Sequence, residues 1–411
     1  MCSEFLKKAV RKFLLGGLLS MIIFSVAEAK PLPEIVWSHD IYTMTIADDY
    51  QHAEKRRGYQ LLNEGTAEEQ KANREIIANA IADKLKEQES KLPFKLKTTL
   101  DTGDISQANF ELNDSAMSKP IALVPIVVTD YSIDKPYVIN NQVYHKYIIV
   151  SAIDIAFCSE DDESGALTIL SNIPLHFYES IPLSNAINDM TEKSRAQLAR
   201  IYANFTASMI KKHLDFTKAG KAVKGLADKE FRMETYRVEN VSYTSDKARD
   251  VLGMNKLMQR IAGNVFTSDF AAHTGNIVYP MILEGDTSSW TTDATQGFYV
   301  AKMNTSHSGE KNIRMPTKVD HKIYLDVSGA GSKEVETKYS SNINGFKVYR
   351  LWMKSNVSGK VIEVTNDITE EFLKTNSISN KIIKEEQEIF GGLMIGAAVK
   401  SAAAQAGKKV K

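Results

Sequence analysis

Three consecutive segments between residues 121 and 178 have the composition of β-strands, and they limit the possible folds more than any other feature of the chain. The first, IALVPIVVTDYS (121–132), is apolar on both faces, as expected inside a sheet, and Pro125 indicates a bulge or an edge position. The second, HKYIIVSAIDIAFC (145–158), is rich in β-branched residues. The third, ALTILSNIPLHFY (166–178), alternates, and one side is expected to carry Leu167, Ile169, Ile173, Leu175 and Phe177.

Two amphipathic segments flank these strands. Thr66 and Glu69 have the spacing of a capping box, in which each side chain accepts a hydrogen bond from the backbone N–H of the other residue. The helix that begins there is expected to end before Pro93 and to pack through Ile77, Ala80, Ile81 and Leu85. A second helix is expected over residues 185–216, with a packed stripe of Leu198, Ile201, Tyr202, Phe205 and Met209. Residues 66–216 therefore predict a first α+β domain.

A similar order of segments follows residue 230. Residues 217–230 are polar and basic and contain glycine, which is typical of a linker. Beyond them the sequence predicts a helix, three strand-like runs and a final helix, at residues 245–273, 276–289, 321–330, 346–359 and 366–390. Residues 290–312 are expected to be an insertion between the first two of these runs. A second α+β domain is thus expected over residues 231–388.

Two local matches raise the question of an internal repeat. Pro280 lies in its apolar run as Pro125 does in residues 121–132, and His321 opens a strand-like run as His145 does. These matches fit either a diverged duplication of a helix–three-strand–helix unit or a chance similarity. The fold class expected from the sequence is α+β, with two domains that each pack a small, mostly antiparallel sheet against helices.

The first 29 residues have the layout of a secretory signal peptide. An uncharged run over residues 13–26 follows four basic residues, Lys7, Lys8, Arg11 and Lys12. Ala27-Glu28-Ala29 then has the small-x-small pattern of a cleavage site, so that Lys30 would begin the exported protein with an extended segment over residues 30–65. The apolar run is shorter than the roughly 20 residues of a transmembrane helix, which disfavours an uncleaved anchor. The expected location is the periplasm or the exterior of the cell.

Charge and cysteine content exclude two classes of protein. The chain has 51 basic and 51 acidic residues, and residues 1–29 hold four of the basic and two of the acidic ones, which leaves 47 basic and 49 acidic residues. A nearly neutral chain has no overall field that would attract nucleic acid. Cys158 is the one cysteine beyond residue 29, so an intramolecular disulfide framework is excluded. Cys158 itself is expected to be a small buried residue near a strand end.

The sequence contains no motif for known catalytic chemistry. H-E-x-x-H, G-x-S-x-G and the P-loop pattern are all missing. The eight histidines are scattered at positions 39, 52, 145, 176, 213, 273, 307 and 321, and no two have the i, i+4 spacing of metal ligands on a helix. No catalytic residue, cofactor or metal is therefore assigned. For an enzyme with a dispersed site, the best candidate is Asp154, because burial in the apolar run SAIDIAF would raise its pKa.

Two polar loops have both a functional and a structural interpretation. Glu160, Asp161, Asp162 and Glu163 follow one another and offer oxygen ligands for Ca²⁺, but the spacing of an EF-hand is absent and a solvated hairpin tip is favoured. DVSGAGSKE carries Gly329, Gly331 and Lys333, which could contact a phosphate, although a flexible β-hairpin is favoured here as well.

The C-terminal segment IFGGLMIGAAVKSAAAQAGKKVK (389–411) begins with an uncharged run and ends with lysines. Its eleven uncharged residues would span about 16 Å as a helix, which is too short to cross a bilayer. One interpretation is close helix packing at Gly392 and Gly396, and another is contact with an anionic membrane surface. A terminus that packs nowhere is the third. The candidate contact residues are Phe390, Gly392, Leu393, Met394, Gly396, Lys400, Lys408, Lys409 and Lys411.

Taken together, these features favour an exported, non-catalytic interaction or assembly protein that binds a protein partner or itself. Whether the protein is an enzyme stays open, although the missing motifs argue against it. Two alternatives are an exported hydrolase whose site is dispersed in sequence, and a membrane-active protein that acts through residues 389–411.

Overall fold

The computed structural model describes most of the chain between residues 32 and 373 and a short C-terminal turn. The described residues are 32–38, 41–44, 61–100, 121–139, 142–161, 164–183, 191–219, 222–223, 226, 234–246, 256–282, 290–304, 310–339, 342–357, 360–373 and 403–408.

The larger sheet closes on itself. Six strands pair in the cyclic order β2–β10–β11–β6–β5–β4–β2, which makes a closed mixed β-barrel. The strands are β2 (Tyr42–Met44), β4 (Ile121–Ile139), β5 (Gln142–Glu160), β6 (Leu167–Leu183), β10 (Phe298–Asn304) and β11 (Glu310–Pro316). The β11–β6 and β2–β4 pairs are parallel and the other four are antiparallel. Three further strands extend this sheet, namely β1 (Glu34–Ser38), β3 (Lys95–Leu100) and β9 (Thr291–Asp293).

The expected fold class is therefore wrong. The molecule does not contain two small antiparallel sheets packed on helices, because residues 291–316 form β9, β10 and β11 and complete the barrel. The barrel takes strands from both sides of residues 217–230, which the sequence analysis assigns to different domains. Closure depends on pairings such as Met303 with Met44 and Ile313 with Leu167, which join segments far apart in sequence.

A second sheet has the order β14–β13–β12–β7–β8. Its strands are β7 (Thr235–Tyr243), β8 (Ile277–Tyr279), β12 (His321–Tyr339), β13 (Asn342–Val357) and β14 (Lys360–Leu373). The expected helix over residues 366–390 is wrong where the structure describes it, because residues 366–373 pair with β13. The expected hairpin around Gly329 and Gly331 is also wrong, since both lie within β12 and pair with Trp352 and Arg350.

The two sheets share one strand order. In the order β3–β1–β4–β5–β6 and the order β8–β7–β12–β13–β14, the first two pairs are parallel and the last two antiparallel. The two residue matches noted in the sequence do not fall on equivalent strands of the two sheets. Pro125 lies in β4 whereas Pro280 follows β8, and His145 lies in β5 whereas His321 begins β12.

In the part of the chain that the structure describes, three long α-helices cover the sheets: α2 (Ala67–Gln88), α3 (Glu192–His213) and α6 (Lys256–Thr274), with short 3-10 turns at Leu61–Asn63, Glu89–Lys91 and Phe216–Ala219. The capping box at the start of α2 is confirmed, because Glu69 N donates to Thr66 Oγ1 at 3.2 Å and Thr66 N donates to Glu69 Oε2 at 2.8 Å. The packed stripe of α3 is confirmed too, with Leu198 and Tyr202 fully buried.

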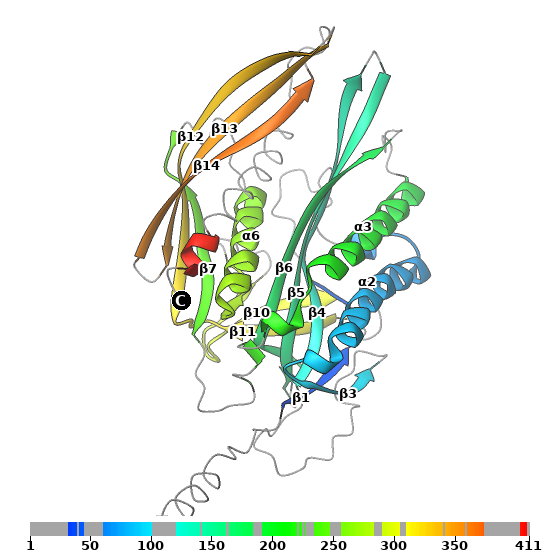
Figure 1. The fold of residues 1–411 in the computed structure, drawn as a ribbon. Helices are drawn as coiled ribbons and strands as arrows, with labels where there is room; N and C mark the ends of the chain where they lie inside the picture. Colours follow the sequence, from blue (N-terminus) through cyan, green and yellow to red (C-terminus); the bar gives the residue numbers. More distant parts are fainter. Residues whose placement is uncertain are drawn as a thin grey trace, which may run out of the picture.

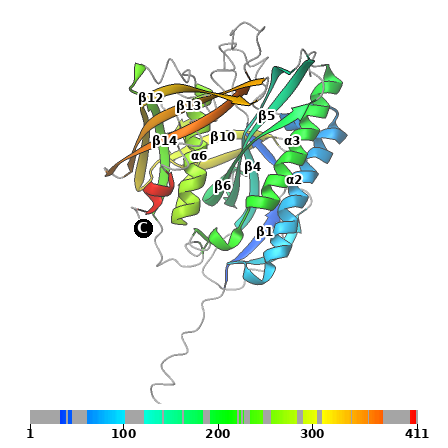
Figure 2. The same cartoon turned by 45° about the horizontal axis from the view of Figure 1, so that its top comes forward.

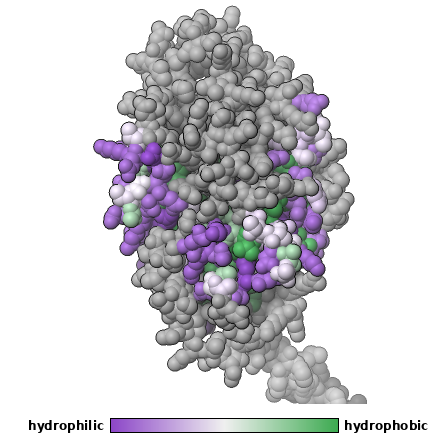
Figure 3. Space-filling model, turned by 180° about the vertical axis from the view of Figure 1, so that it is seen from behind, coloured by the Kyte–Doolittle hydropathy of each residue, from purple (hydrophilic) through white to green (hydrophobic). Residues whose placement is uncertain are grey.

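The layers follow one another across the molecule. Helices α2 and α3 pack side by side on one face of β4, β5 and β6 (Figure 2). Helix α6 lies between the two sheets, where it contacts β6 of the barrel and β7 of the second sheet (Figure 1). Seen from behind, the surface of the described residues is mostly hydrophilic with small apolar areas between (Figure 3).

Two hydrophobic clusters occupy opposite faces of the barrel strands. One packs under α2 and α3 and includes Ile153, Leu175 and Phe177, while the other fills the barrel and includes Leu167 and Ile169. The expectation that the apolar residues of residues 166–178 share one side is wrong. A bulge shifts the register between β5 and β6 at Phe157 and Cys158, so the strand changes face between Ile169 and Ile173.

Candidate functional site

A buried polar contact joins the barrel to the second sheet. Asp154 on β5 is 4% exposed, and its Oδ1 accepts a hydrogen bond from Asn172 Nδ2 on β6 at 3.2 Å. The same nitrogen donates to the backbone carbonyl of Val278 on β8 at 2.9 Å. Strand β8 pairs with β7 in the second sheet, whereas Ile277 and Tyr279 pack into the barrel core. One amide therefore bridges a buried carboxyl group of the barrel and the backbone of the other sheet.

The surroundings of Asp154 change its acidity. Burial raises the pKa of the Asp154 carboxyl to about 7, and the hydrogen bond from Asn172 only partly offsets this effect. Burial also raises the pKa of the Cys158 thiol, and the nearby Asp154 raises it further. Cys158 is buried, as the sequence predicts, and its thiol stays protonated at neutral pH. The pair thus offers one group that titrates near neutrality and no thiolate nucleophile.

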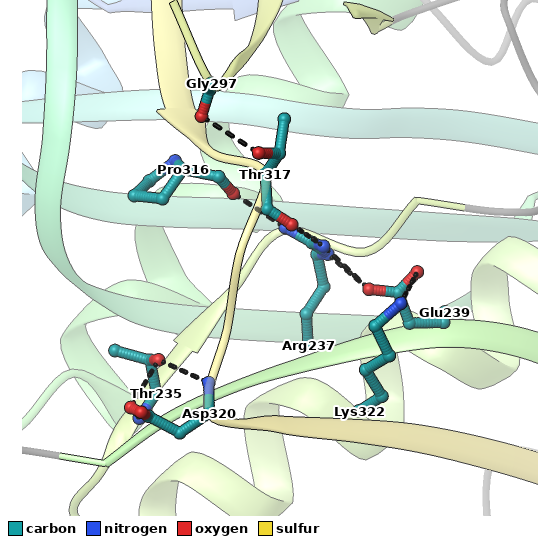
Figure 4. A network of polar contacts seen from close by, with 8 residues as sticks. All are labelled: Thr235, Arg237, Glu239, Gly297, Pro316, Thr317, Asp320 and Lys322. Carbon is teal, nitrogen blue, oxygen red and sulfur yellow. Dashed lines mark hydrogen bonds and ion pairs between the residues drawn. The ribbon is translucent and has the colours of Figure 1, made fainter. Parts of the chain in front are cut away.

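A second junction centres on a fully buried arginine, Arg237 of β7 (Figure 4). Its Nε and Nη2 donate to Glu239 Oε1 at 3.0 and 2.7 Å. Nη1 donates to the carbonyl of Pro316 at 2.8 Å, and Nη2 also donates to the carbonyl of Thr317 at 2.8 Å. The guanidinium lies 4.8 Å from the ring centroid of Tyr299 on β10. Each guanidinium nitrogen is used inside the protein, so Arg237 ties β7 to the segment between β11 and β12.

Neighbouring polar contacts hold the same segment. Thr317 Oγ1 donates to the carbonyl of Gly297 at 3.0 Å, which links it to the start of β10. Thr235 donates to Asp320 Oδ2 through its backbone N–H at 3.0 Å and its hydroxyl at 2.8 Å (Figure 4). Lys322 Nζ lies 4.0 Å from Glu239 Oε2. The arrangement fixes the entry of the chain into β12.

The acidic loop is a hairpin tip between β5 and β6, as expected, but two of its carboxylates form ion pairs. Glu160 lies 3.3 Å from Lys311 Nζ, and Asp161 accepts from Arg314 Nη2 at 3.0 Å. Arg314 also donates to Thr168 at 3.1 Å, and these two residues form one of the two pairs that join β11 to β6. The hydrogen bond from the Ser164 backbone holds the pKa of Asp161 well below its usual range, and Arg314 adds to this effect.

The calcium interpretation finds no support in the described part of the chain. Within it, no group of three or more His, Cys, Asp or Glu side chains is placed to hold a metal ion. Asp162 and Glu163 lie outside the described residues. Glu160 and Asp161 instead close the barrel seam through the cations of β11.

The other sequence candidates are dispersed. Lys333 pairs with Val348 within β12 and β13, so the segment weighed as a phosphate-binding loop, and not favoured as one, lies inside a strand. His321 stacks on Tyr236 with ring centroids 4.6 Å apart, and its Nε2 lies 3.6 Å from Glu234. His213 lies 5.9 Å from the ring of Phe177. The histidines at positions 39, 52 and 307 lie outside the described residues.

The C-terminal candidates fall mostly outside the described residues. Only Lys408 among them is described, and it is exposed on a short helical turn over residues 403–408. Ala403 and Ala406 of this turn are buried, and Gly407 lies against His273 and Thr274 at the end of α6. The described helices include none that is long and apolar enough to span a membrane. The candidates outside the described residues are Ala27, Ala29, Lys30, Phe390, Gly392, Leu393, Met394, Gly396, Lys400, Lys409 and Lys411.

Sequence reasoning missed Arg237 and Asn172. For Arg237 a signal exists, because Arg237 and Glu239 are two apart in a strand-like run, TYRVENVSY, and alternate residues of a strand share a face. For Asn172 no local signal exists, because its role depends on Val278 of a different sheet.

Comparisons with known proteins give little. No protein-family profile and no curated protein sequence matches the chain. One solved structure that is similar over part of the chain is a hypothetical protein, CT253, from Chlamydia trachomatis. The identity is 12%, the alignment covers 43% of this chain and 96% of that chain, and the TM-score is 0.18. A TM-score this low supports no argument about fold or function.

Proposed function

We propose that the protein is exported to the cell envelope and acts there as a non-catalytic interaction or assembly protein. The observation that carries the proposal is the use of its charged groups. Arg237, Asp161 and Arg314 are all engaged in contacts that join one strand segment to another, and Glu239 holds the Arg237 guanidinium. Charged side chains whose hydrogen bonds and ion pairs hold strands together favour a structural role over catalysis.

The shape of the two meanders supports the same proposal. Strands β4, β5 and β6 have 19, 19 and 17 residues, and β12, β13 and β14 have 19, 16 and 14, whereas strands average about six. A 19-residue strand is about 60 Å long. Figure 1 shows both meanders rising past α6 in the same direction. Long hairpins of this kind give a protein a reach suited to contact with partners or other copies.

Strand β14 offers a specific mode of contact. It is the last strand in the order of the second sheet, and its 14 residues pair with β13 alone among the described strands. An edge strand presents backbone N–H and C=O groups that can accept a strand from another chain. Self-association or binding of an extended segment would use this edge.

Export rests on the first 29 residues, with their basic start, apolar run and Ala27-Glu28-Ala29. Peripheral membrane contact through residues 389–411 is part of the proposal. Lys408 is exposed on a turn that is held to α6, and Lys409 and Lys411 follow it. We expect Lys408, together with the lysines that follow it in the sequence, to interact with anionic lipid.

The export part is tested by sequencing the N-terminus of the protein recovered from the envelope fraction. The expected first residue is Lys30. Recovery of an intact Met1 would contradict cleavage and imply a retained anchor.

The interaction part is tested by shortening the hairpins. One variant replaces residues 135–146 at the β4–β5 end with Asn-Gly, and a matched variant replaces residues 334–347 at the β12–β13 end, both between paired strand positions. Chemical cross-linking in cells should show that at least one variant loses complexes formed by the wild type, while the thermal transition of the core is kept. Complexes that persist unchanged in both variants would refute a role for the meanders.

A further inference from the structure

The contact between Asp154, Asn172 and Val278 has the chemistry of a proton-dependent lock. Asn172 Nδ2 uses its two hydrogens on Asp154 Oδ1 and on the carbonyl of Val278. Asn172 Oδ1 is buried and has no hydrogen-bond partner among the described residues. A buried acceptor without a donor is costly, so this site is complete only if a neighbour supplies a proton.

A protonated Asp154 carboxyl can supply that proton. A carboxylic acid and a primary amide form a cyclic pair, in which the acid O–H donates to the amide oxygen while the amide N–H donates to the acid carbonyl. The second hydrogen of Nδ2 then stays on Val278. An ionised Asp154 can accept but not donate, which leaves Asn172 Oδ1 without a partner and a charge in an apolar interior.

We infer that the protonated Asp154–Asn172 pair locks β8, and with it the second sheet, onto the barrel, and that loss of the proton releases this junction. Released here means a local opening in which β8 separates from β6 and water reaches Asp154. The rest of the barrel is expected to stay folded, because α2 and α3 pack on the opposite face of the strands. The raised pKa of the carboxyl places the change in the range of ordinary environmental pH.

Other titratable or charged groups lie on the elements around Asp154, and the test must distinguish their effect on the junction from that of Asp154. The elements in this region are β4, β5, β6, β8 and α6. On β4 the residue paired with Asp154 is Ile126, which does not titrate. On the remaining elements, Cys158 of β5 interacts electrostatically with Asp154, β6 carries His176, Tyr279 follows Val278 on β8, and α6 carries Arg260, Asp269 and His273. His176, which pairs with Ala152 two positions along the ladder from Asp154, is the one that needs its own control.

The expected opening has a defined pH profile. The opened Asp154 would regain a pKa near 4, so the population of the open junction should rise about tenfold per pH unit between pH 4 and 7 and level off above that. Between pH 5 and 7 the rise should be roughly fifty-fold. The profile is measured by hydrogen–deuterium exchange of the full chain, with exchange rates corrected for the intrinsic effect of pH, on peptides that cover residues 277–282 and, as an internal reference, α2.

In the wild type, residues 277–282 should lose protection over this pH range while α2 does not. Asp154→Asn keeps the shape of the side chain and its acceptor but cannot ionise, so its protection of residues 277–282 should not depend on pH. His176→Gln should keep the wild-type profile. The inference is overturned if Asp154→Asn retains the wild-type profile, if His176→Gln loses it, or if α2 opens together with β8.

A second variant keeps the test decisive if Asp154→Asn does not fold. Asn172→Ala removes both the hydrogen bond to Val278 and the acceptor for the Asp154 proton, so residues 277–282 should be less protected at pH 5 than in the wild type, and their protection should change less with pH. Wild-type protection of residues 277–282 at pH 5 in Asn172→Ala would overturn the inference on its own.

Discussion

The side-chain amide of Asn172 donates a hydrogen bond to the backbone carbonyl of Val278 at 2.9 Å, although 106 positions separate the two residues in sequence. This bond joins β6 of the barrel to β8 of the second sheet, and the same amide also holds Asp154. Arg237 makes the reciprocal connection, from β7 of the second sheet to the end of β11. The two sheets are therefore tied by polar contacts in both directions.

The stability of the protein should depend on pH through Asp154. Its pKa is raised from the usual 3.8 to about 7, so the native state holds a proton that the unfolded state releases between these values. The contribution of Asp154 to the free energy of unfolding should be greatest below pH 4, fall as pH rises towards 7 and then stay constant. The total fall should be on the order of 4 kcal/mol. Urea unfolding at pH 4.5, 6 and 7.5 measures it.

Asp154→Asn should remove most of this pH dependence, because an amide does not ionise in this range. Asp83→Asn is the matched control, since Asp83 is an exposed carboxylate paired with Lys211 at 2.8 Å. That variant should keep the wild-type slope of stability against pH. Equal slopes for all three proteins would show that Asp154 is not the group responsible.

Arg237→Met should destabilise the protein by about 3–5 kcal/mol, because it leaves a partly buried Glu239 and two backbone carbonyls without the donors of the fully buried guanidinium. Arg237→Lys should recover little of this loss, since an ammonium cannot reproduce the planar set of donors. The free energy of unfolding in urea is the measurement.

The control for Arg237 is Lys322→Met, which removes a half-exposed cation 4.0 Å from the same Glu239. Its effect should stay within about 0.5 kcal/mol of zero. A loss at Lys322 as large as that at Arg237 would contradict the assignment of the junction to the buried guanidinium.

Thr66→Ala should destabilise the protein by about 1 kcal/mol, because the Thr66 hydroxyl accepts a hydrogen bond from the Glu69 backbone at the start of α2. Thr66→Ser keeps the hydroxyl and should be close to the wild type. A thermal or urea transition resolves the difference. If Ala and Ser are equivalent at this position, the cap contributes nothing to stability.

Gly407→Val should detach the C-terminal turn from α6. A Cβ at Gly407 would lie 2.8 Å from His273 Cβ and 3.4 Å from Thr274 Cγ2, so the turn must shift. Overpacking of this kind costs about 1–3 kcal/mol, which should appear as faster amide exchange in residues 403–408. Gln405→Val is the control, since Gln405 is exposed on the same turn. Equal exchange in both variants would mean that the contact with α6 does not hold the turn.

The sequence by itself determined the parts of the structure that depend on neighbours in the chain. The Thr66–Glu69 spacing starts a helix because its two hydrogen bonds close within three residues, and the structure has both. The apolar runs at residues 121–132 and 145–158 form strands because their β-branched and other apolar residues favour an extended backbone, and Cys158 is buried as its run predicts. For the candidate site, composition predicted that burial would raise the pKa of Asp154, and this is confirmed.

Only the tertiary structure decided how these parts join. Strand β2 has three residues and carries no pattern of its own, yet its pairing with β10 and β4 closes the barrel. Residues 366–373 form β14 because β13 provides a partner, which overrides their helical pattern. The single bulge between β5 and β6 reverses the faces of the residues beyond it. Each of these outcomes depends on backbone hydrogen bonds to distant segments. The residues of one segment do not specify which distant strand will supply those bonds.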